Sequence, residues 1–176
     1  TQSVTDFSVP SEGYGQFLVD VFHEWYEHDV GKIYVSQFDN LLGQWLGYPS
    51  TTCVHQPRCG QSLITEANGD VYACDHFVYP EYKVGNLTQQ PLTEIVFSSK
   101  QQQFGLEKSQ KLTALCRHCE FRKLCYGGCP KHRFVSLENE PNPHNYLCAS
   151  YRYFFEQTAP YMQAMAHQIR LHPSAA

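Results

Sequence analysis

Hydrophobic residues recur at helical spacing in several stretches of the chain. The first stretch covers residues 11–30, where Ser11 follows Pro10 as a candidate N-cap and Gly31 marks the stop. Its apolar residues are spaced i, i+1, i+4, i+5, i+8 and i+9, at Phe17, Leu18, Val21, Phe22, Trp25 and Tyr26. Further helices are predicted at residues 39–47, 92–97, 99–108 and 151–169. We expect Pro160 to kink or restart the last of these, because proline removes a backbone donor.

Short runs of β-forming residues predict strands between these helices. Residues 33–38 are rich in β-branched and aromatic side chains and predict one short strand. Residues 63–66 and 71–73 flank Asn68-Gly69, the strongest short-range signal for a hairpin. The hairpin would place Cys74, Asp75 and His76 at the exit of its second strand.

The order helix, strand, helix in residues 1–52 is typical of an α/β layer, in which one strand alone cannot close a sheet. We therefore expect sequence upstream of Thr1 that completes this layer. From residue 53 onward the pattern changes to short elements and turns, and residues 113–143 have little regular period. The fold class is predicted as α+β.

The charge balance excludes several classes of partner. A net charge of -4, without any Lys/Arg run, argues against nucleic acid and against an anionic membrane surface. No apolar stretch approaches the roughly 20 residues that a membrane-spanning helix needs. The first residues lack the charged and apolar regions of a signal peptide, so we expect a cytoplasmic protein. In a reducing compartment, cysteines stay free or bind metal.

The cysteines are the most informative residues of the chain. There are 8 of them, the complement of two four-thiolate centres. The first group reads Cys53-x5-Cys59-x14-Cys74, and the second reads Cys116-x2-Cys119-x5-Cys125-x3-Cys129-Pro130, with Cys148 further on. The second group resembles the bacterial ferredoxin run, whose last cysteine ligates the other of two iron–sulfur clusters. The sequence therefore predicts two [4Fe–4S] clusters.

Zinc and disulfide bonds are the alternatives to this interpretation. Structural zinc sites favour short Cys-x2-4-Cys pairs, and here only Cys116–Cys119 and, more loosely, Cys125–Cys129 have such spacing. Disulfides would suit a secreted domain, for which residues 86–88 would form a glycosylation acceptor. High disulfide density is, however, usual in chains below about 80 residues.

The order of the cysteines resembles the SPASM domain of radical S-adenosylmethionine enzymes. Residues 69–87 and 116–130 resemble, more particularly, the anaerobic sulfatase-maturating enzymes. This resemblance implies three parts. Residues 1–52 would be the last helix–strand–helix of a partial (β/α)6 barrel, residues 53–150 a SPASM auxiliary-cluster domain with a β-hairpin, and residues 151–176 a C-terminal helix.

One feature of that family is missing from the sequence. The catalytic cluster of the family is held by a Cys-x3-Cys-x2-Cys run, which this chain does not contain. We therefore expect S-adenosylmethionine to bind only to the full-length enzyme, and residues 1–176 alone to be inactive. A fragment prepared in air could carry zinc, because vacant thiolate sites accept another metal that binds soft sulfur ligands.

The resemblance also implies a chemistry. In the family, a 5′-deoxyadenosyl radical removes a β-hydrogen from a cysteine or serine of a sulfatase, and the product is Cα-formylglycine. The resemblance implies that the two auxiliary clusters are held by Cys53, Cys59, Cys74 and Cys129, and by Cys116, Cys119, Cys125 and Cys148.

Asp75 directly follows the predicted ligand Cys74 and matches the general base of the family. Beside a buried cluster, desolvation would raise the pKa of this carboxylate toward its task. The alternative role for Asp75 is to cap a turn in solvent. His76 is expected to pack.

The partners that the resemblance implies are a sulfatase polypeptide as substrate and an electron donor such as flavodoxin or ferredoxin. Three other functions stay open on the sequence alone. They are another SPASM peptide maturase, a stand-alone electron-transfer module, and a structural zinc module.

Overall fold

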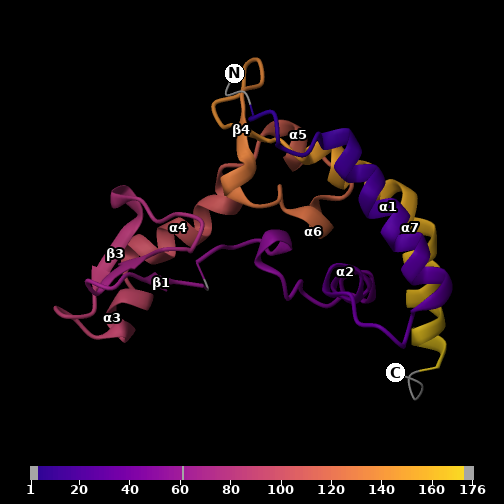
Figure 1. Cartoon of the computed structure of the whole chain (residues 1–176), viewed down its shortest axis with the longest axis horizontal. Helices are drawn as coiled ribbons and strands as arrows, with labels where there is room; N and C mark the ends of the chain where they lie inside the picture. Colours follow the sequence, from indigo (N-terminus) through magenta and orange to yellow (C-terminus); the bar gives the residue numbers. More distant parts are fainter. Residues whose placement is uncertain (1–3, 61, 173–176) are drawn as a thin grey trace.

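The computed structural model describes residues 4–60 and 62–172. A few residues lie outside this description, namely 1–3, 61 and 173–176. They fall within the expected parts 1–52, 53–150 and 151–176, respectively. The described residues form helices and two small antiparallel sheets, in agreement with the predicted α+β class (Figure 1). No helix within the described residues is both long and apolar enough to cross a membrane.

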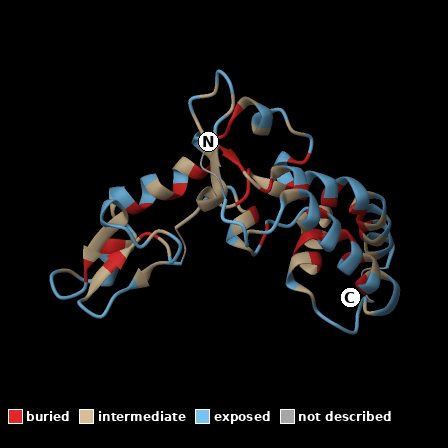
Figure 2. Ribbon diagram, turned by 45° about the horizontal axis from the view of Figure 1, so that its top comes forward, coloured by how far each residue is buried: buried red, intermediate tan, exposed pale blue. Residues whose placement is uncertain are grey.

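Three helices form the larger core: α1 (Ser11–His28), α2 (Ser36–Leu46) and α7 (Cys148–Leu171). α1 runs alongside α7, and α2 also contacts α7 (Figures 1 and 2). The ring of Phe22 on α1 lies 5.4 Å from that of Phe38 on α2 and 6.2 Å from that of Phe154 on α7, between ring centroids. Burial of these aromatic side chains joins the two ends of the chain into one layer.

The helices near the N-terminus agree with the predicted ranges, with differences at their edges. Leu18, Phe22 and Trp25 are buried, whereas Phe17 and Val21 from the same predicted stripe are 59% and 38% exposed. Ser11 is the first helical residue rather than the N-cap, and α1 ends at His28, before Gly31. α2 ends at Gly47 as predicted, in the left-handed conformation that glycine adopts without steric cost.

The predicted strand at residues 33–38 is wrong. The backbone donors of this segment are already used locally: Ile33 N–H donates to the Asp29 carbonyl, and Val35 N–H donates to the Asp39 carboxylate at 2.8 Å. The carbonyl of Ile33 accepts the indole N–H of Trp25 at 2.9 Å. Without a neighbouring strand to pair with, a turn and the start of α2 satisfy these groups instead.

The predicted hairpin is confirmed and carries an additional strand. β1 (Ile64–Thr65), β2 (Asp70–Tyr72) and β3 (Lys83–Asn86) form an antiparallel sheet in that order. The 3-10 turns at Cys53–His55 and Pro80–Tyr82 lie on either side of the hairpin in sequence. α3 (Leu92–Val96) and α4 (Ser99–Gln110) follow, as the helical predictions at 92–97 and 99–108 require.

Residues 113–147 contain only short elements, in agreement with their weak periodicity. These are α5 (Ala114–Arg117), α6 (Arg122–Cys125), a 3-10 turn at Pro130–His132, and the paired strands β4 (Arg133–Val135) and β5 (His144–Asn145). α7 begins at Cys148 and continues through Pro160, so the expected restart there does not occur. Phe154 before the proline and Met162 after it are both buried, and packing on both sides keeps the helix continuous.

Candidate functional site

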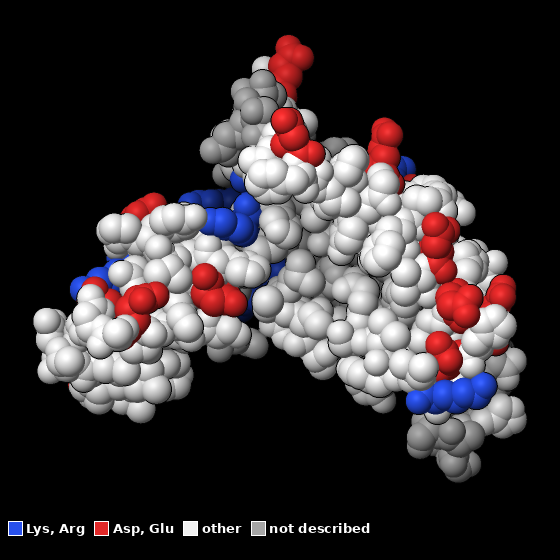
Figure 3. Space-filling model, viewed as in Figure 1, with Lys and Arg blue, Asp and Glu red and all other residues white. Residues whose placement is uncertain are grey.

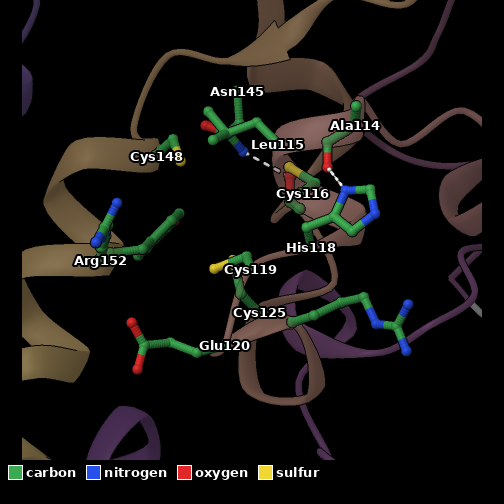
Figure 4. Close-up of a pocket in the computed structure, with 13 residues that line it drawn as sticks. Ala114, Leu115, Cys116, His118, Cys119, Glu120, Cys125, Asn145, Cys148 and Arg152 are labelled. Carbon is green, nitrogen blue, oxygen red and sulfur yellow. Dashed lines mark hydrogen bonds between the residues drawn. The ribbon is translucent and has the colours of Figure 1, made fainter.

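Four of the predicted ligands line one cavity. Cys116, Cys119, Cys125 and Cys148 surround a space of about 540 Å³ (Figure 4). We refer to these four as the second thiol group. Figure 4 shows Cys116, Cys119 and Cys148 projecting into the same space from α5, the turn after it and the start of α7. Residues more than 30 positions apart in sequence therefore contribute thiols to one site.

The local structure around Cys116 depends on capping and on a buried histidine. The Thr113 hydroxyl caps α5 by accepting the backbone N–H of Cys116 at 3.3 Å. The same hydroxyl lies 3.0 Å from Nδ1 of His144, which is itself 3.7 Å from the Cys116 sulfur. A ring N–H at this position can donate to the sulfur of a bound thiolate.

A left-handed loop separates Cys125 from Cys129. Tyr126, Gly127 and Gly128 all have positive φ angles, of 48°, 73° and 62°. The Asn145 amide holds this loop by donating to the Gly127 carbonyl at 2.9 Å. The chain thus reverses immediately after Cys125, and Cys129 leaves the cavity of the second thiol group.

The conformation of this loop leads to a test of stability. A methyl group at Gly128 would collide with the Asn145 side chain and would also require a left-handed alanine. We expect Gly128→Ala to lower the free energy of unfolding by about 1–2 kcal/mol, the cost of that conformation alone. Gly43→Ala is the control, because a methyl group there meets no atom within 4 Å. In the middle of α2 it should raise the free energy of unfolding by about 0.5–1 kcal/mol.

Urea unfolding of both variants, performed anaerobically, measures these changes. Equal effects of the two substitutions would mean that the Tyr126–Gly128 loop is not held in this conformation.

Three of the other predicted ligands, Cys53, Cys59 and Cys74, are held at or beside their backbone by residues of α4. We refer to Cys53, Cys59, Cys74 and Cys129 as the first thiol group. The carbonyl of Gly105 accepts the backbone N–H of Cys59 at 3.2 Å, and the Gln101 amide donates to the carbonyls of Gly60 at 2.8 Å and Ala73 at 3.2 Å. α4 therefore holds the backbone on both sides of the hairpin, next to two of the four cysteines.

Lys108 completes this face of α4. Its Nζ donates to the carbonyls of Cys53 at 2.6 Å and Val54 at 3.0 Å. Gln101, Gly105 and Lys108 are spaced i, i+4 and i+7, so they lie on one side of the helix. A side chain at position 105 would collide with the Cys59 carbonyl, so the glycine allows α4 to approach the backbone of Cys59 closely.

The pKa values of the thiols follow the same division into two groups. Burial raises the pKa of Cys59, and the nearby charges of Cys129 and Cys53 add to that increase. Burial raises the pKa of Cys125 to about 12, and the nearby charges of Cys148 and Cys116 act in the same direction.

Two more thiols fit the same division. Burial raises the pKa of Cys74 to about 12, and the nearby charge of Cys59, from the first group, acts in the same direction. Burial raises the pKa of Cys148 to about 11, and the charges of Cys116 and Cys119, from the second group, add to that increase. Thiols with such pKa values are protonated at neutral pH, so binding a metal would release protons.

The spacing of the thiols distinguishes among kinds of metal site. Among the described residues, the single set of three donor atoms lying within 4.8 Å of one another belongs to Cys74, Asp75 and His76. Those three residues are consecutive, so their proximity follows from the sequence. Within the same described residues, no three thiols of either group lie that close together.

Asp75 differs from its expected state. It is exposed, and its Oδ1 accepts the Cys74 thiol at 3.1 Å and the backbone N–H of His76 at 3.0 Å. The hydrogen bond from the Cys74 thiol lowers the pKa of this carboxyl, whereas the rise expected through desolvation applies to a carboxylate beside a bound cluster. His76 is also exposed rather than packed, and its Nδ1 lies 3.6 Å from the Cys129 sulfur.

Arg133 is a further residue that the sequence did not single out. Its guanidinium donates to the carbonyls of Tyr126 at 2.8 Å, Gly127 at 3.1 Å and Lys108 at 2.7 Å. One side chain thus joins α4 to the left-handed loop. Acidic side chains are scattered over the face drawn in Figure 3, and basic atoms show in separate places, one of them at the end of α4 nearest β4 and another near the C-terminal end of α7.

Comparison with known proteins places this geometry in a family. The SPASM family, an iron–sulfur cluster-binding domain, matches residues 53–120. A serine-type anaerobic sulfatase-maturating enzyme of Bacteroides thetaiotaomicron is 44% identical over 95% of this chain and 40% of its own length. The chain matches the C-terminal part of the anaerobic sulfatase-maturating enzymes.

Other anaerobic sulfatase-maturating enzymes resemble the chain in sequence and in structure. A cysteine-type anaerobic sulfatase-maturating enzyme of Clostridium perfringens (strain 13 / Type A) is 31% identical over 94% of this chain and 45% of its own length. The solved structure of native anSMEcpe with bound AdoMet and Kp18Cys peptide has a TM-score of 0.82, with 31% identity over 96% of this chain and 47% of that one. The chain thus spans less than half the length of each of these three relatives.

Proposed function

We propose that this chain is the auxiliary iron–sulfur part of a cytoplasmic anaerobic sulfatase-maturating enzyme that oxidises a cysteine or serine of a sulfatase to Cα-formylglycine. The observation that carries this proposal is the arrangement of the cysteines. One group of four lines a cavity, three of the other four (Cys53, Cys59 and Cys129) lie near Lys108 of α4, and Cys74 lies near Cys59. Residues 1–52 would then be the end of the partial barrel that holds the radical site.

Each thiol group is proposed to hold one [4Fe–4S] cluster. A zinc ion binds thiolates at about 2.3 Å, which brings its ligands within about 4.6 Å of one another. No three thiols of either group among the described residues meet that limit. A four-iron cluster needs one thiolate for each iron. The eight thiols supply two such sets, and the match of residues 53–120 to an iron–sulfur cluster-binding domain supports clusters over zinc.

The proposed clusters would supply a path for the electron that leaves the substrate when the aldehyde forms. The chain itself contributes the thiolates and fixes their positions. Asp75 presents a carboxylate beside Cys74, where it can accept a proton from a substrate residue. The proposed partners are a sulfatase polypeptide and an electron donor such as flavodoxin or ferredoxin, and S-adenosylmethionine would bind in the full-length enzyme.

Anaerobic reconstitution of the full-length enzyme with iron and sulfide tests this function. We expect iron and sulfide bound at both thiol groups in addition to the radical site, about four irons for each cluster. The loaded enzyme should convert a cysteine- or serine-containing sulfatase peptide to its formylglycine form, detected by mass spectrometry. Stoichiometric zinc in place of iron after anaerobic preparation would exclude the proposal.

A further inference from the structure

Lys108 is a buried lysine, and among the described residues its charge pairs with no carboxylate. Its side chain is 1% exposed, and both of its hydrogen-bond partners, the Cys53 and Val54 carbonyls, are acceptors. Within residues 4–60 and 62–172, the ion pairs involve other side chains. Burying an ammonium group costs free energy unless an opposite charge compensates it. A negative charge near Lys108 would therefore stabilise it.

The nearby groups that can become negative are the thiols of the first group. Nζ of Lys108 lies 2.6 Å from the carbonyl oxygen of Cys53. Burial lowers the pKa of this lysine, and the nearby negative charges of Cys59, Cys129 and Cys53 act in the opposite direction. Arg133, by contrast, interacts with thiols of both groups, among them Cys116 and Cys59. The two cations therefore differ: Arg133 lies between the thiol groups, whereas Lys108 belongs to the first.

We propose that Lys108 is the counter-cation of the first thiol group and gives the iron–sulfur cluster held there a more positive reduction potential than it would have without this charge. This inference rests on the proposed function. Adding one electron makes a four-thiolate cluster more negative by one charge, and a fixed positive charge favours the more negative state. Net charge and hydrogen bonding are among the factors that set cluster potentials, and a charge in a water-poor site is weakly screened.

The substitutions Lys108→Met and Lys108→Gln separate the charge of this side chain from its hydrogen bonds. Methionine removes the charge and the donors, whereas glutamine removes the charge and keeps an N–H donor. Lys111→Met is the matched control, because Lys111 is the C-cap residue of α4, is exposed and pairs with Glu107 at 2.7 Å. It changes the net charge of the chain by the same amount, away from the first thiol group.

The measurement is a potentiometric titration of the full-length, reconstituted enzyme with dithionite, followed by electron paramagnetic resonance. The signal of the first group is identified by its loss in Cys74→Ser. We expect both Lys108 variants to change the ratio of reduced to oxidised cluster about tenfold at a fixed potential, a midpoint shift of about 59 mV to more negative values. Lys111→Met should leave the midpoint where it is.

Each other outcome decides the question. A midpoint unchanged in Lys108→Gln but shifted in Lys108→Met would assign the effect to hydrogen bonding and overturn the inference. If both variants lose iron from the first group, Lys108→Arg decides: retained iron at the original potential supports the charge role, and lost iron indicates packing alone. A full-length enzyme without iron at these cysteines refutes the proposed function itself, whereas bound iron with unchanged potentials refutes only the role of Lys108.

Discussion

Replacement of Asp75 by asparagine in the full-length enzyme is expected to lower formylglycine production by about 10²–10⁴-fold, the usual contribution of a positioned general base. Asparagine keeps the size of the side chain and an oxygen that can accept the His76 N–H, a bond of 3.0 Å in the structure. It cannot accept a proton from the substrate. The carboxylate is exposed beside Cys74, where a peptide could reach it.

The iron content distinguishes loss of a base from loss of a cluster. Asp75→Asn should bind as much iron as the wild-type enzyme, because each proposed cluster already has four thiolates. Glu81→Gln is the control, since Glu81 is another exposed carboxylate on the segment that follows Asp75. Its substitution should leave the rate within about twofold. Near-normal production by Asp75→Asn would return this residue to a turn-capping role.

The parts of the fold that depend on local signals could be predicted from the sequence. Asn68-Gly69 specifies its hairpin by backbone conformation alone, and Gly47 ends α2 for the same reason. Whether residues 33–38 form a strand could not be predicted from local signals, because a strand requires a neighbouring strand to pair with. The side chain of Asp39 and the carbonyl of Asp29 instead bind the backbone N–H groups of this segment.

The cysteines could be identified from the sequence, but the residues that position them could not. α4 is a polar helix, and Gln101 and Lys108 in such a helix are typical of a solvated face. In the structure both are buried, because their partners are backbone carbonyls from positions 41 and 55 residues away. No local pattern encodes such contacts, and an exposed Asp75 could not be distinguished from a buried one by its neighbours in sequence.

The crossing of Cys129 to the hairpin cysteines is expected to appear as a pattern of iron loss. Cys125→Ser and Cys129→Ser change residues only four positions apart, yet each should remove a different cluster and about half of the auxiliary iron. The reason is the left-handed loop from Tyr126 to Gly128, which reverses the chain between the two cysteines. Single variants alone would not show which cluster was lost.

Double variants assign each cysteine to its cluster. Cys129→Ser combined with Cys74→Ser should lose no more iron than Cys129→Ser alone, because both residues would hold the first cluster. Cys129→Ser combined with Cys119→Ser should lose nearly all of the auxiliary iron, because one ligand is then missing from each cluster. The non-additivity of Cys129→Ser and Cys74→Ser is the expected behaviour of residues that share a site. If Cys129→Ser is additive with Cys74→Ser instead, Cys129 belongs to the second thiol group and the crossed arrangement is wrong. The separation of Cys129 from the cavity of the second group favours the first result.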